Sequence, residues 1–409
     1  MKKKEIIKYA YNNSPFYKKR YVKLAEDILV GNINIEDIPI VRKEDIIECE
    51  LNMLSEEFYE DYIQHKYTKF YTSGSTGTCL QIYWGDKEYN SSLLGLWYLR
   101  KKYYGIEPDD RCCTFFLNGR QGNKEYKQIR SGNMLSFSKS NLDEKRIRDI
   151  YHEMEKFQPR YLIIEPSIAV LFSRCKKKYH FKDIESICYV ELTGEYLYNE
   201  VRKEIEDCFK CNIANQYGAY EVNSIAYECP YGNMHCMSKN VYVEILNKKR
   251  EKVSDGVEGE ICVTSLTNRT MPFIRYMIGD RGKICKNITC KCGNLSPILH
   301  LVSARSNDYI RCKDGSDMHY SVFVKAVENT NKVLNNPIIQ FQIRQVDYKY
   351  FVVKLVLSSL DIDKDKLIWT FCQLIEEERL VNSKLEFCFL DELFPDSKTG
   401  KLKCFVGMD

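Results

Sequence analysis

The chain has 409 residues, enough to bury a full hydrophobic core and to divide into two or more domains. Its 44% hydrophobic and 29% charged residues are typical of a globular protein, and no stretch has the uninterrupted apolar length of a membrane-spanning helix. The net charge is only +4, with acidic and basic residues interspersed, which argues against a nucleic-acid-binding surface.

The N-terminus begins with basic residues and becomes amphipathic at once, at Ile6, Ile7 and Ala10, without an apolar signal core. We therefore expect a cytoplasmic protein. In that compartment the 18 cysteines are expected to be reduced thiols rather than disulfides, and most of them lie in apolar patterns as small core residues.

The first distinctive segment along the chain is a turn rich in hydroxyl groups and glycine, between predicted strands at Lys69–Tyr71 and Leu80–Trp84. The turn contains Thr72, Ser73, Gly74, Ser75, Thr76 and Gly77. Glycine lets the backbone approach a ligand closely, and successive backbone N–H groups with the hydroxyls can form an anion-binding nest. It is not a Walker A loop, because no Gly-Lys-Ser/Thr follows. Alone, such a cluster is more often an ordinary turn.

From about residue 141 helical and extended patterns alternate. The pattern predicts helices at 143–157, 167–177 and 199–209 and strands at 161–164, 187–192 and 212–217. Such alternation favours a parallel sheet covered by helices on both faces. Ligands bind at the carboxyl ends of the strands in such sheets, and two polar turns are expected there, Thr193–Glu195 and Gln216–Glu221.

Farther along, the alternation of side chains indicates antiparallel strands at 241–245 and 260–264, with a turn at Asp255-Gly256. The last hundred residues predict a hairpin (338–344 and 350–357), a helix (363–378) and a strand (385–390). The expected fold class is therefore α/β. A large N-terminal domain (1–303) combines parallel β-sheets flanked by helices with an antiparallel β subdomain, and a small α+β domain (304–409) follows.

Five segments occur in one order along the chain: Tyr71–Gly77, Gln216–Glu221, Arg275–Asp280, Arg305–Asp308 and Lys398–Lys401. Together they resemble the adenylate-forming superfamily of acyl-CoA synthetases, peptide-synthetase adenylation domains and luciferases. The run Met271–Tyr276 is most similar to the phenylacetate–CoA ligase branch. One of these motifs alone would be weak, but the resemblance covers nearly the whole chain.

The resemblance implies a ligase that uses ATP and Mg²⁺ to convert a carboxylic acid into an acyl-adenylate, releasing pyrophosphate, and then transfers the acyl group to a thiol, most simply coenzyme A. Catalysis would consist of positioning two anions and neutralising charge as pyrophosphate departs. In this scheme the acyl-adenylate remains bound after the first step, and AMP is the group that leaves when the thiol attacks it. The small domain swings between the two steps and is therefore mobile.

The same resemblance implies roles for individual residues. The turn from Thr72 to Gly77 would cradle the β- and γ-phosphates, and Glu221 would help to hold Mg²⁺. The adenine and acyl sites would be lined by Gly194, Glu195, Gln216, Tyr217 and Gly218. Asp280 would accept hydrogen bonds from both ribose hydroxyls. Arg305 would contact ribose or phosphate, and Lys401 would stabilise the transferring α-phosphate.

The chain departs from the family pattern at several positions. Tyr220 stands where the family has Thr, Ala304 and Asn307 replace a glycine and an acidic hinge residue, and no lysine closes the phosphate loop. A tight turn at Lys313–Ser316 replaces the glycine loop that passes the thiol arm. The adenylation half matches the family better than the thioester half, so an amine or a carrier-protein thiol stays open as the acyl acceptor.

A metal site is indicated by two separated segments. Cys229 and His235 bracket one glycine-containing segment, and Cys290 and Cys292 precede Gly293 in another. Three thiolates and one imidazole can hold Zn²⁺ in a closed tetrahedral, structural site, which would stabilise these loops by up to about 10 kcal/mol. Cys236 and Cys285 are competing ligands, and the alternative is that all these cysteines are free thiols.

Two classes of function therefore stay open. The first is the ligase, acting on a small-molecule carboxylic acid. The 30 Tyr and 19 Phe suit an aryl acid but equally suit a core, and Trp97, Tyr98, Phe115 and Phe116 are candidates for the acyl site, with core packing the alternative for each. The second is a non-catalytic, zinc-containing binding module on a degenerate adenylation fold. A homodimer is the default assembly, with no nucleic-acid or membrane partner.

Overall fold

The computed structural model describes most of the chain. The described residues are 3–47, 49–71, 80–116, 120–121, 124–125, 127–139, 142, 144–197, 199–303, 309–313, 317–334, 337–359, 361–377, 380, 383–391, 393 and 404–408. The chain forms two compact units, residues 1–304 and 305–409. Within the described part, no helix combines the length and apolar character needed to cross a bilayer.

The first unit begins with short helices. They are α1 (Lys3–Asn13), α2 (Pro15–Arg20), α3 (Ala25–Val30), α4 (Glu44–Ile47), α5 (Glu50–Met53) and α6 (Tyr59–Ile63), with single 3₁₀ turns at Val22–Leu24, Ile35–Asp37 and Glu56–Phe58. The expected strands follow as an antiparallel hairpin, β1 (Thr68–Tyr71) and β2 (Gln81–Trp84), in which Thr68 faces Trp84 and Tyr71 faces Gln81. The long helix α7 (Asp86–Tyr104) comes next and ends at Gly105, whose φ is +66°.

A twelve-stranded sheet forms the centre of this unit, in the order β13-β14-β15-β16-β12-β11-β10-β9-β8-β3-β7-β6. Its parallel part consists of β3 (Cys112–Phe116), β7 (Met134–Ser138), β8 (Tyr161–Ile164), β9 (Tyr189–Thr193) and β10 (Asn212–Ala219). Its antiparallel part consists of β6 (Gln128–Ser131), β11 (Asn223–Glu228), β12 (Met234–Cys236), β13 (Val241–Leu246), β14 (Gly259–Ser265), β15 (Tyr276–Cys285) and β16 (Ile298–Ser303). A two-residue pair, β4 (Arg120–Gln121) and β5 (Lys124–Glu125), stands apart.

The predicted α/β fold class is confirmed, with one refinement. The antiparallel strands are not a detached layer, because β11 and β12 join them to the parallel strands in the same sheet. The predicted helices appear as α8 (Glu144–Phe157), α9 (Pro166–Tyr179) and α10 (Asn199–Phe209). Helix α8 ends just before Pro159, which lacks the N–H that a continuing helix needs.

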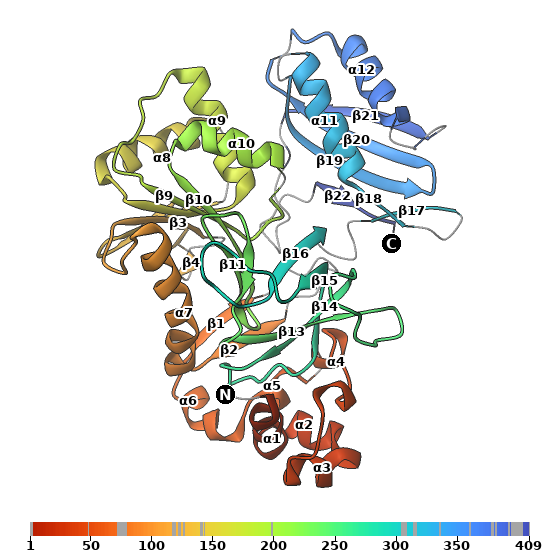
Figure 1. The fold of residues 1–409 in the computed structure, drawn as a ribbon. Coiled ribbons are helices and arrows are strands. Elements are labelled where there is room, and N and C mark those ends of the chain that lie inside the picture. Colours follow the sequence, from red (N-terminus) through yellow and green to blue (C-terminus); the bar gives the residue numbers. More distant parts are fainter. Residues whose placement is uncertain are drawn as a thin grey trace. The chain divides into compact units, whose positions relative to one another are not determined.

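Helices cover the parallel strands on opposite faces (Figure 1). On one face, α8, α9 and α10 bury Phe137, Leu162 and Val190 of the sheet in one apolar core. On the other face, Leu96 and Leu99 of α7 belong to the core that contains Tyr161, Tyr189 and Ala214. Along each strand, alternate side chains therefore enter different cores, as expected for a sheet that is buried on both sides.

The second unit is an α+β structure with its own core. The described strands β21 (Lys384–Leu390), β20 (Tyr350–Leu357), β19 (Ile338–Asp347) and β22 (Phe405–Val406) form a four-stranded sheet in that order. Helices α11 (Ser321–Val333) and α12 (Lys364–Glu377) pack on this sheet, and Phe323, Phe351 and Phe371 are fully buried between them. A small hairpin of β17 (Tyr309–Arg311) and β18 (Asp317–His319) precedes α11.

Candidate functional site

The β1–β2 hairpin that carries the Ser/Gly turn is anchored on Tyr220. The ring of Phe70 stacks on the ring of Tyr220, with centroids 4.9 Å apart and planes at 10°. Nε1 of Trp84 donates a hydrogen bond to the backbone oxygen of Tyr220 at 2.8 Å. The hairpin ends therefore lie next to the turn that carries Glu221, a side chain that is only 8% exposed.

Polar side chains meet at the carboxyl ends of β9 and β10. Thr193 on β9 faces Gln216 on β10, and its hydroxyl donates to the Gln216 amide oxygen. The amide nitrogen of Gln216 donates to the Ser224 hydroxyl at 2.9 Å, so both ends of this amide are held. Gly194 follows with a φ of +83°, a conformation that glycine adopts without strain.

Tyr217 and Asp280 approach each other from β10 and β15. The Tyr217 hydroxyl donates to Oδ2 of Asp280 at 2.6 Å, a charge-assisted bond between residues 63 positions apart. The register of β10 against β11 shifts between Tyr217 and Gly218. A side chain at Gly218 would have its Cβ 2.7 Å from both the Asn223 backbone oxygen and Nε2 of Gln216, so the backbone here is closely enclosed.

Tyr220 lies beside two carboxylates. Partial burial of this tyrosine, which is 46% exposed, together with the negative charges of Glu165 and Glu221, raises the pKa of its hydroxyl. Tyr220 therefore stays neutral at physiological pH. Its ring adds bulk where the resemblance expected a threonine.

Glu195 serves helix α9 in this structure. Its carboxylate accepts hydrogen bonds from the backbone N–H of Ser167 at 2.9 Å and from the Ser167 hydroxyl at 2.8 Å. A carboxylate at this place compensates unsatisfied N–H groups of the first helical turn. Other predicted nucleotide-site residues, Thr72, Ser73, Gly74, Ser75, Thr76, Gly77, Arg305 and Lys401, lie outside the described residues.

One polar pair in this region was not predicted. The Lys139 ammonium forms an ion pair with the Glu165 carboxylate, and the two side chains are only 12% and 13% exposed. Lys139 follows β7, and Glu165 follows β8 and is the N-cap residue of α9. Glu165 could have been noted as a polar residue after a predicted strand, but β7 was not predicted, so nothing in the sequence signalled its partner.

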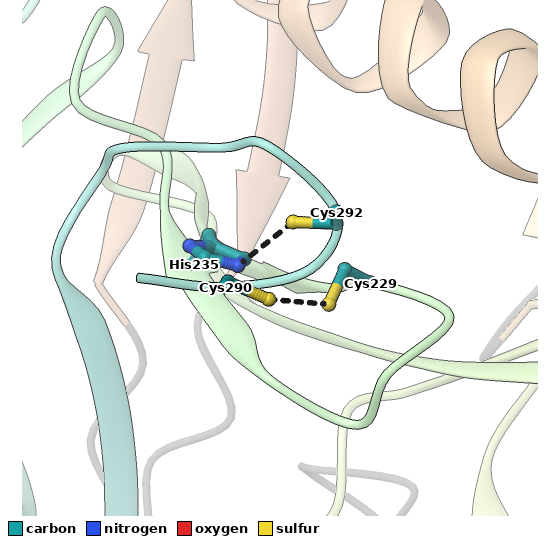
Figure 2. A group of neighbouring side chains, drawn as sticks. All are labelled: Cys229, His235, Cys290 and Cys292. Atoms are coloured by element: carbon teal, nitrogen blue, oxygen red, sulfur yellow. Dashed lines mark hydrogen bonds between the residues drawn. The ribbon is translucent and has the colours of Figure 1, made fainter. Parts of the chain in front are cut away.

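The four predicted zinc ligands form one cluster (Figure 2). The ligand atoms of Cys229, His235, Cys290 and Cys292 all lie within 4.8 Å of one another. Sγ of Cys229 lies 3.7 Å from Sγ of Cys290, and Sγ of Cys292 lies 3.2 Å from Nε2 of His235. The competing cysteines, Cys236 and Cys285, are not members of this group.

Two similar turns present the cysteines. The N–H of Gly232 donates to the oxygen of Cys229 at 2.9 Å, and the N–H of Gly293 donates to the oxygen of Cys290 at 3.0 Å. Both glycines have positive φ, +74° and +75°, a conformation that allows the backbone to form each of these tight turns. The first turn links β11 to β12, and the second lies in the connection from β15 to β16.

The surroundings of the cluster supply hydrogen bonds to two of the sulfur atoms and orient the histidine. Nδ1 of His235 lies 3.0 Å from the backbone oxygen of Ser296, which leaves Nε2 directed at the sulfur atoms. Nδ2 of Asn233 donates to Sγ of Cys290 at 3.3 Å, and the N–H of Asn294 donates to Sγ of Cys292 at 3.4 Å. Although burial opposes it, hydrogen bonding lowers the pKa of Cys290 to about 6, whereas burial raises the pKa of Cys229 to about 12.

Comparison with known proteins gave matches over the chain. A family model described as AMP-binding enzyme matches residues 62–269. Protein CapK of Staphylococcus aureus is 23% identical over 416 residues, covering 98% of this chain and 87% of that protein. A phenylacetate-coenzyme A ligase of Thermus thermophilus is 23% identical over 163 residues, covering 38% of this chain and 36% of that protein.

Among solved structures, a 2-hydroxyisobutyryl-CoA ligase in its postadenylation state matches with a TM-score of 0.76 at 13% identity. The match covers 99% of this chain and 87% of that one. At this identity the likeness concerns the fold alone. The matches bear out the resemblance found in the sequence motifs.

Proposed function

Because the chain belongs to the AMP-binding enzyme family, we propose that it activates a carboxylic acid with ATP and Mg²⁺ as the acyl-adenylate, releasing pyrophosphate, and then transfers the acyl group to a thiol. The observation that carries this proposal is the 2.6 Å hydrogen bond from Tyr217 to Asp280. This bond joins two predicted nucleotide-site residues that are far apart in sequence. The turn that follows β10 contains Tyr220, to which the β1–β2 hairpin is anchored by Trp84.

The chemistry assigns a separate task to each side chain. Asp280 is an acceptor-only carboxylate, so it suits two ribose hydroxyls, and Tyr217 fixes one of its oxygens. Glu221, nearly buried beside the hairpin, would share Mg²⁺ with the phosphates. Gly194, with its positive φ and no neighbour closer than 3.4 Å to an added Cβ, would let the backbone approach adenine and the acyl group.

Residues outside the described part complete the proposal by resemblance. The turn from Thr72 to Gly77 would hold the β- and γ-phosphates, Arg305 would contact ribose or phosphate, and Lys401 would offset charge on the α-phosphate as pyrophosphate leaves. The second unit would swing after the first step to admit the acceptor. Coenzyme A is the simplest acceptor, with a carrier-protein thiol or an amine as alternatives.

We also propose that the Cys/His cluster holds structural zinc. Zinc with Zn–S bonds of about 2.3 Å and a Zn–N bond of about 2.0 Å places its ligand atoms roughly 3.5 to 3.8 Å apart. The separations of 3.7 Å and 3.2 Å are close to that, and His235 has the outer hydrogen bond common among zinc-bound histidines. With four protein ligands the ion would have no open position for catalysis, and it would join the β11–β12 turn to the β15–β16 connection.

The setting proposed for this enzyme is the cytoplasm, where ATP and coenzyme A are available and thiols stay reduced. The 17 described cysteines are all free of disulfides. A two-fold dimer is the default assembly.

Pyrophosphate release tests the proposal. The protein is incubated with Mg·ATP and a panel of aryl, alkyl and hydroxylated acids, first without and then with coenzyme A. Release without thiol is expected for at least one acid, and mass spectrometry of the second reaction is expected to show its thioester. Silence with every acid, together with no calorimetric binding of AMP, would overturn the ligase and favour the non-catalytic zinc-containing module.

A further inference from the structure

The parallel strands place a layer of polar side chains at their carboxyl ends. Ser138 at the end of β7 is opposite Phe116 of β3, and Thr193 at the end of β9 is opposite Gln216 of β10. Between them β8 ends at Ile164, which is opposite Leu192, so the next residue, Glu165, lies level with Thr193. Because alternate residues share a face, these side chains continue the face that α7 covers, not the apolar face under α8–α10.

Glu165 lies in this layer and next to Gly194, and its ion-pair partner Lys139 directly follows Ser138 at the end of β7. A methyl group added at Gly194 would lie 3.4 Å from Cγ and 3.8 Å from Oε1 of Glu165. Glu165 therefore borders the Gly194 turn, which the proposed function assigns to the adenine and acyl sites.

The hydrogen-bonding capacity of this ion pair determines which chemical group of a substrate can bind against it. An ammonium has three N–H donors and a carboxylate has about four acceptor sites, so their mutual contact leaves hydrogen-bonding capacity. An apolar ring in contact with the pair would displace water from both charged groups without forming a hydrogen bond to either of them. Such desolvation costs binding free energy. A hydroxyl group replaces that water, since it donates to the carboxylate and accepts from the ammonium. A charged group would unbalance the neutral pair.

Three of the four aromatic residues that suggested an aryl acid have other roles. The fourth, Phe116, lies at the end of β3 opposite Ser138 and belongs to neither apolar core. Phe115 packs against Phe137 and Phe172 in the core under the helices. Trp97 contacts Tyr161 edge to face and lies under the guanidinium of Arg100 at 4.5 Å. Tyr98 is 63% exposed. These three side chains, then, offer no support for an aromatic acyl site.

We propose that the acid activated by this enzyme carries a hydroxyl group, which binds the Lys139–Glu165 pair and determines specificity. This inference rests on the proposed function, because it takes the Gly194 turn as the border of the acyl site. It names the substrate class as hydroxylated carboxylic acids and makes Lys139 and Glu165 the residues that select them.

The test compares matched acids in pyrophosphate release from Mg·ATP. The pairs are lactate with propionate, 2-hydroxyisobutyrate with isobutyrate, 3-hydroxybutyrate with butyrate, and 4-hydroxyphenylacetate with phenylacetate. For at least one pair, kcat/KM of the hydroxylated acid is expected to exceed that of its deoxy partner by about tenfold or more, since a hydrogen bond to a charged group sets this scale.

Variants connect this preference to the pair. Lys139→Met with Glu165→Leu replaces both charges by apolar groups of similar volume, which buried pairs often tolerate. It is expected to reduce the hydroxyl-to-deoxy ratio to about one, mainly by raising KM of the hydroxylated acid, with AMP affinity unchanged. The single variant Glu165→Gln removes only the negative charge, and the same hydroxyl-to-deoxy ratio is measured for it. Lys176→Met is the control, because Lys176 is a lysine of similar burial, 16% exposed, that pairs with Asp183 on the helical side.

The outcomes separate the two proposals. No pyrophosphate release with any acid, together with no calorimetric binding of AMP, would overturn the proposed function itself. Release that favours the deoxy or aryl acids, or a hydroxyl preference that survives in the double variant, would overturn the specificity assignment while leaving the ligase intact. If the double variant fails to fold, as judged by its melting temperature, Glu165→Gln decides, and an unchanged hydroxyl-to-deoxy ratio in it contradicts the assignment.

Discussion

The hydroxyl of Tyr217 donates to Asp280 at 2.6 Å, across the strands β10 and β15, which are not neighbours in the sheet. Strands β11, β12 and β16 lie between them in the sheet order, so only the curvature of the sheet brings the two side chains together. The bond fixes Oδ2 of Asp280, and because the carboxylate is planar and rigid, the position of Oδ1 is fixed as well. A ligand with two adjacent hydroxyls finds an acceptor that is already ordered.

Asp280→Ala is expected to weaken AMP binding by about 10- to 100-fold, the scale of losing hydrogen bonds to a charged acceptor. Tyr217→Phe keeps the carboxylate and only loosens it, so we expect a loss of about tenfold or less. Titration calorimetry with AMP measures both. Lys283→Met, on the same strand, serves as the control and should bind AMP normally. Equal affinity of Asp280→Ala and the wild type would refute the ribose role of Asp280.

Gly218→Ala tests the enclosed backbone beside Tyr217. The new methyl group would lie 2.7 Å from the Asn223 oxygen, which belongs to the backbone and has no freedom to rotate away. We expect strain of about 1 to 3 kcal/mol and a displaced Tyr217, hence lower AMP affinity. Gly95→Ala is the matched control, because the nearest neighbour of its methyl group would be the flexible end of Met237 at 3.1 Å, with Oδ1 of Asn240 at an ordinary contact distance of 3.9 Å.

Calorimetry with AMP and a urea denaturation curve would be recorded for both glycine variants. The expected result is a loss of affinity in Gly218→Ala alone, with Gly95→Ala as stable as the wild type or more so. Wild-type AMP affinity in Gly218→Ala would mean that this stretch of β10 tolerates displacement and does not position Tyr217.

The sequence predicted the parallel strands β8, β9 and β10, whose signals are local, but not β3 and β7. Helix α8 was expected at 143–157 and runs from Glu144 to Phe157, since one apolar face and a following proline define it. Helix α7 was not expected. Its buried positions include Ser92 and Arg100, which are satisfied by Asn223 and Glu191 from distant strands and carry no apolar periodicity.

The difference between local sequence signals and contacts with distant strands also explains which parts of the site could be predicted. Cysteine and histidine spacing indicated the metal cluster, although its halves are some 60 residues apart, because few other patterns combine those residue types with glycine. The Lys139–Glu165 pair has no such signature. It depends on β7 pairing with β3, and β3 with β8, which are tertiary contacts that no short segment encodes.

Cys292→Ser is expected to lose zinc and to lower the melting temperature by at least about 5 °C, because removing a thiolate ligand weakens a site whose binding energy is folding energy. Metal analysis of the purified chain and a thermal melt measure the two effects. Cys285→Ser, outside the cluster, should keep both metal and stability. A wild-type chain that contains no zinc when purified without chelator would contradict the zinc proposal outright.

Lys401→Ala is expected to reduce pyrophosphate release by at least about 100-fold, the scale of removing one preorganised charge from a transition state. Thioester formation from a supplied acyl-adenylate should continue at close to the wild-type rate, since that step follows the departure of pyrophosphate. Lys398→Ala is the nearby control. An equal loss in both half-reactions would show that Lys401 has a different role from the one assigned.

Arg275→Met tests the buried ion pair that begins the Arg275–Asp280 motif. Arg275 lies 3.2 Å from Glu244, whose side chain is fully buried, and it also donates to the backbone oxygens of Glu36 and Ile38. Removing the guanidinium leaves the carboxylate unpaired, so we expect a loss of about 3 to 5 kcal/mol in the free energy of unfolding. Urea denaturation measures it, and Lys252→Met, at a half-exposed pair with Glu36, is the control.

The loss should depend on pH in a defined direction. Burial raises the pKa of Glu244 even while Arg275 opposes the shift, so without Arg275 the pKa in the folded state rises further. In the folded variant Glu244 then keeps its proton up to this raised pKa, whereas in the unfolded chain Glu244 loses its proton at the ordinary pKa of a glutamate. Stability consequently falls as pH rises through the window between these two pKa values. Arg275→Met should be closer to the wild type in stability at pH 5 than at pH 8, and a difference independent of pH would show that Glu244 stays ionised without its partner.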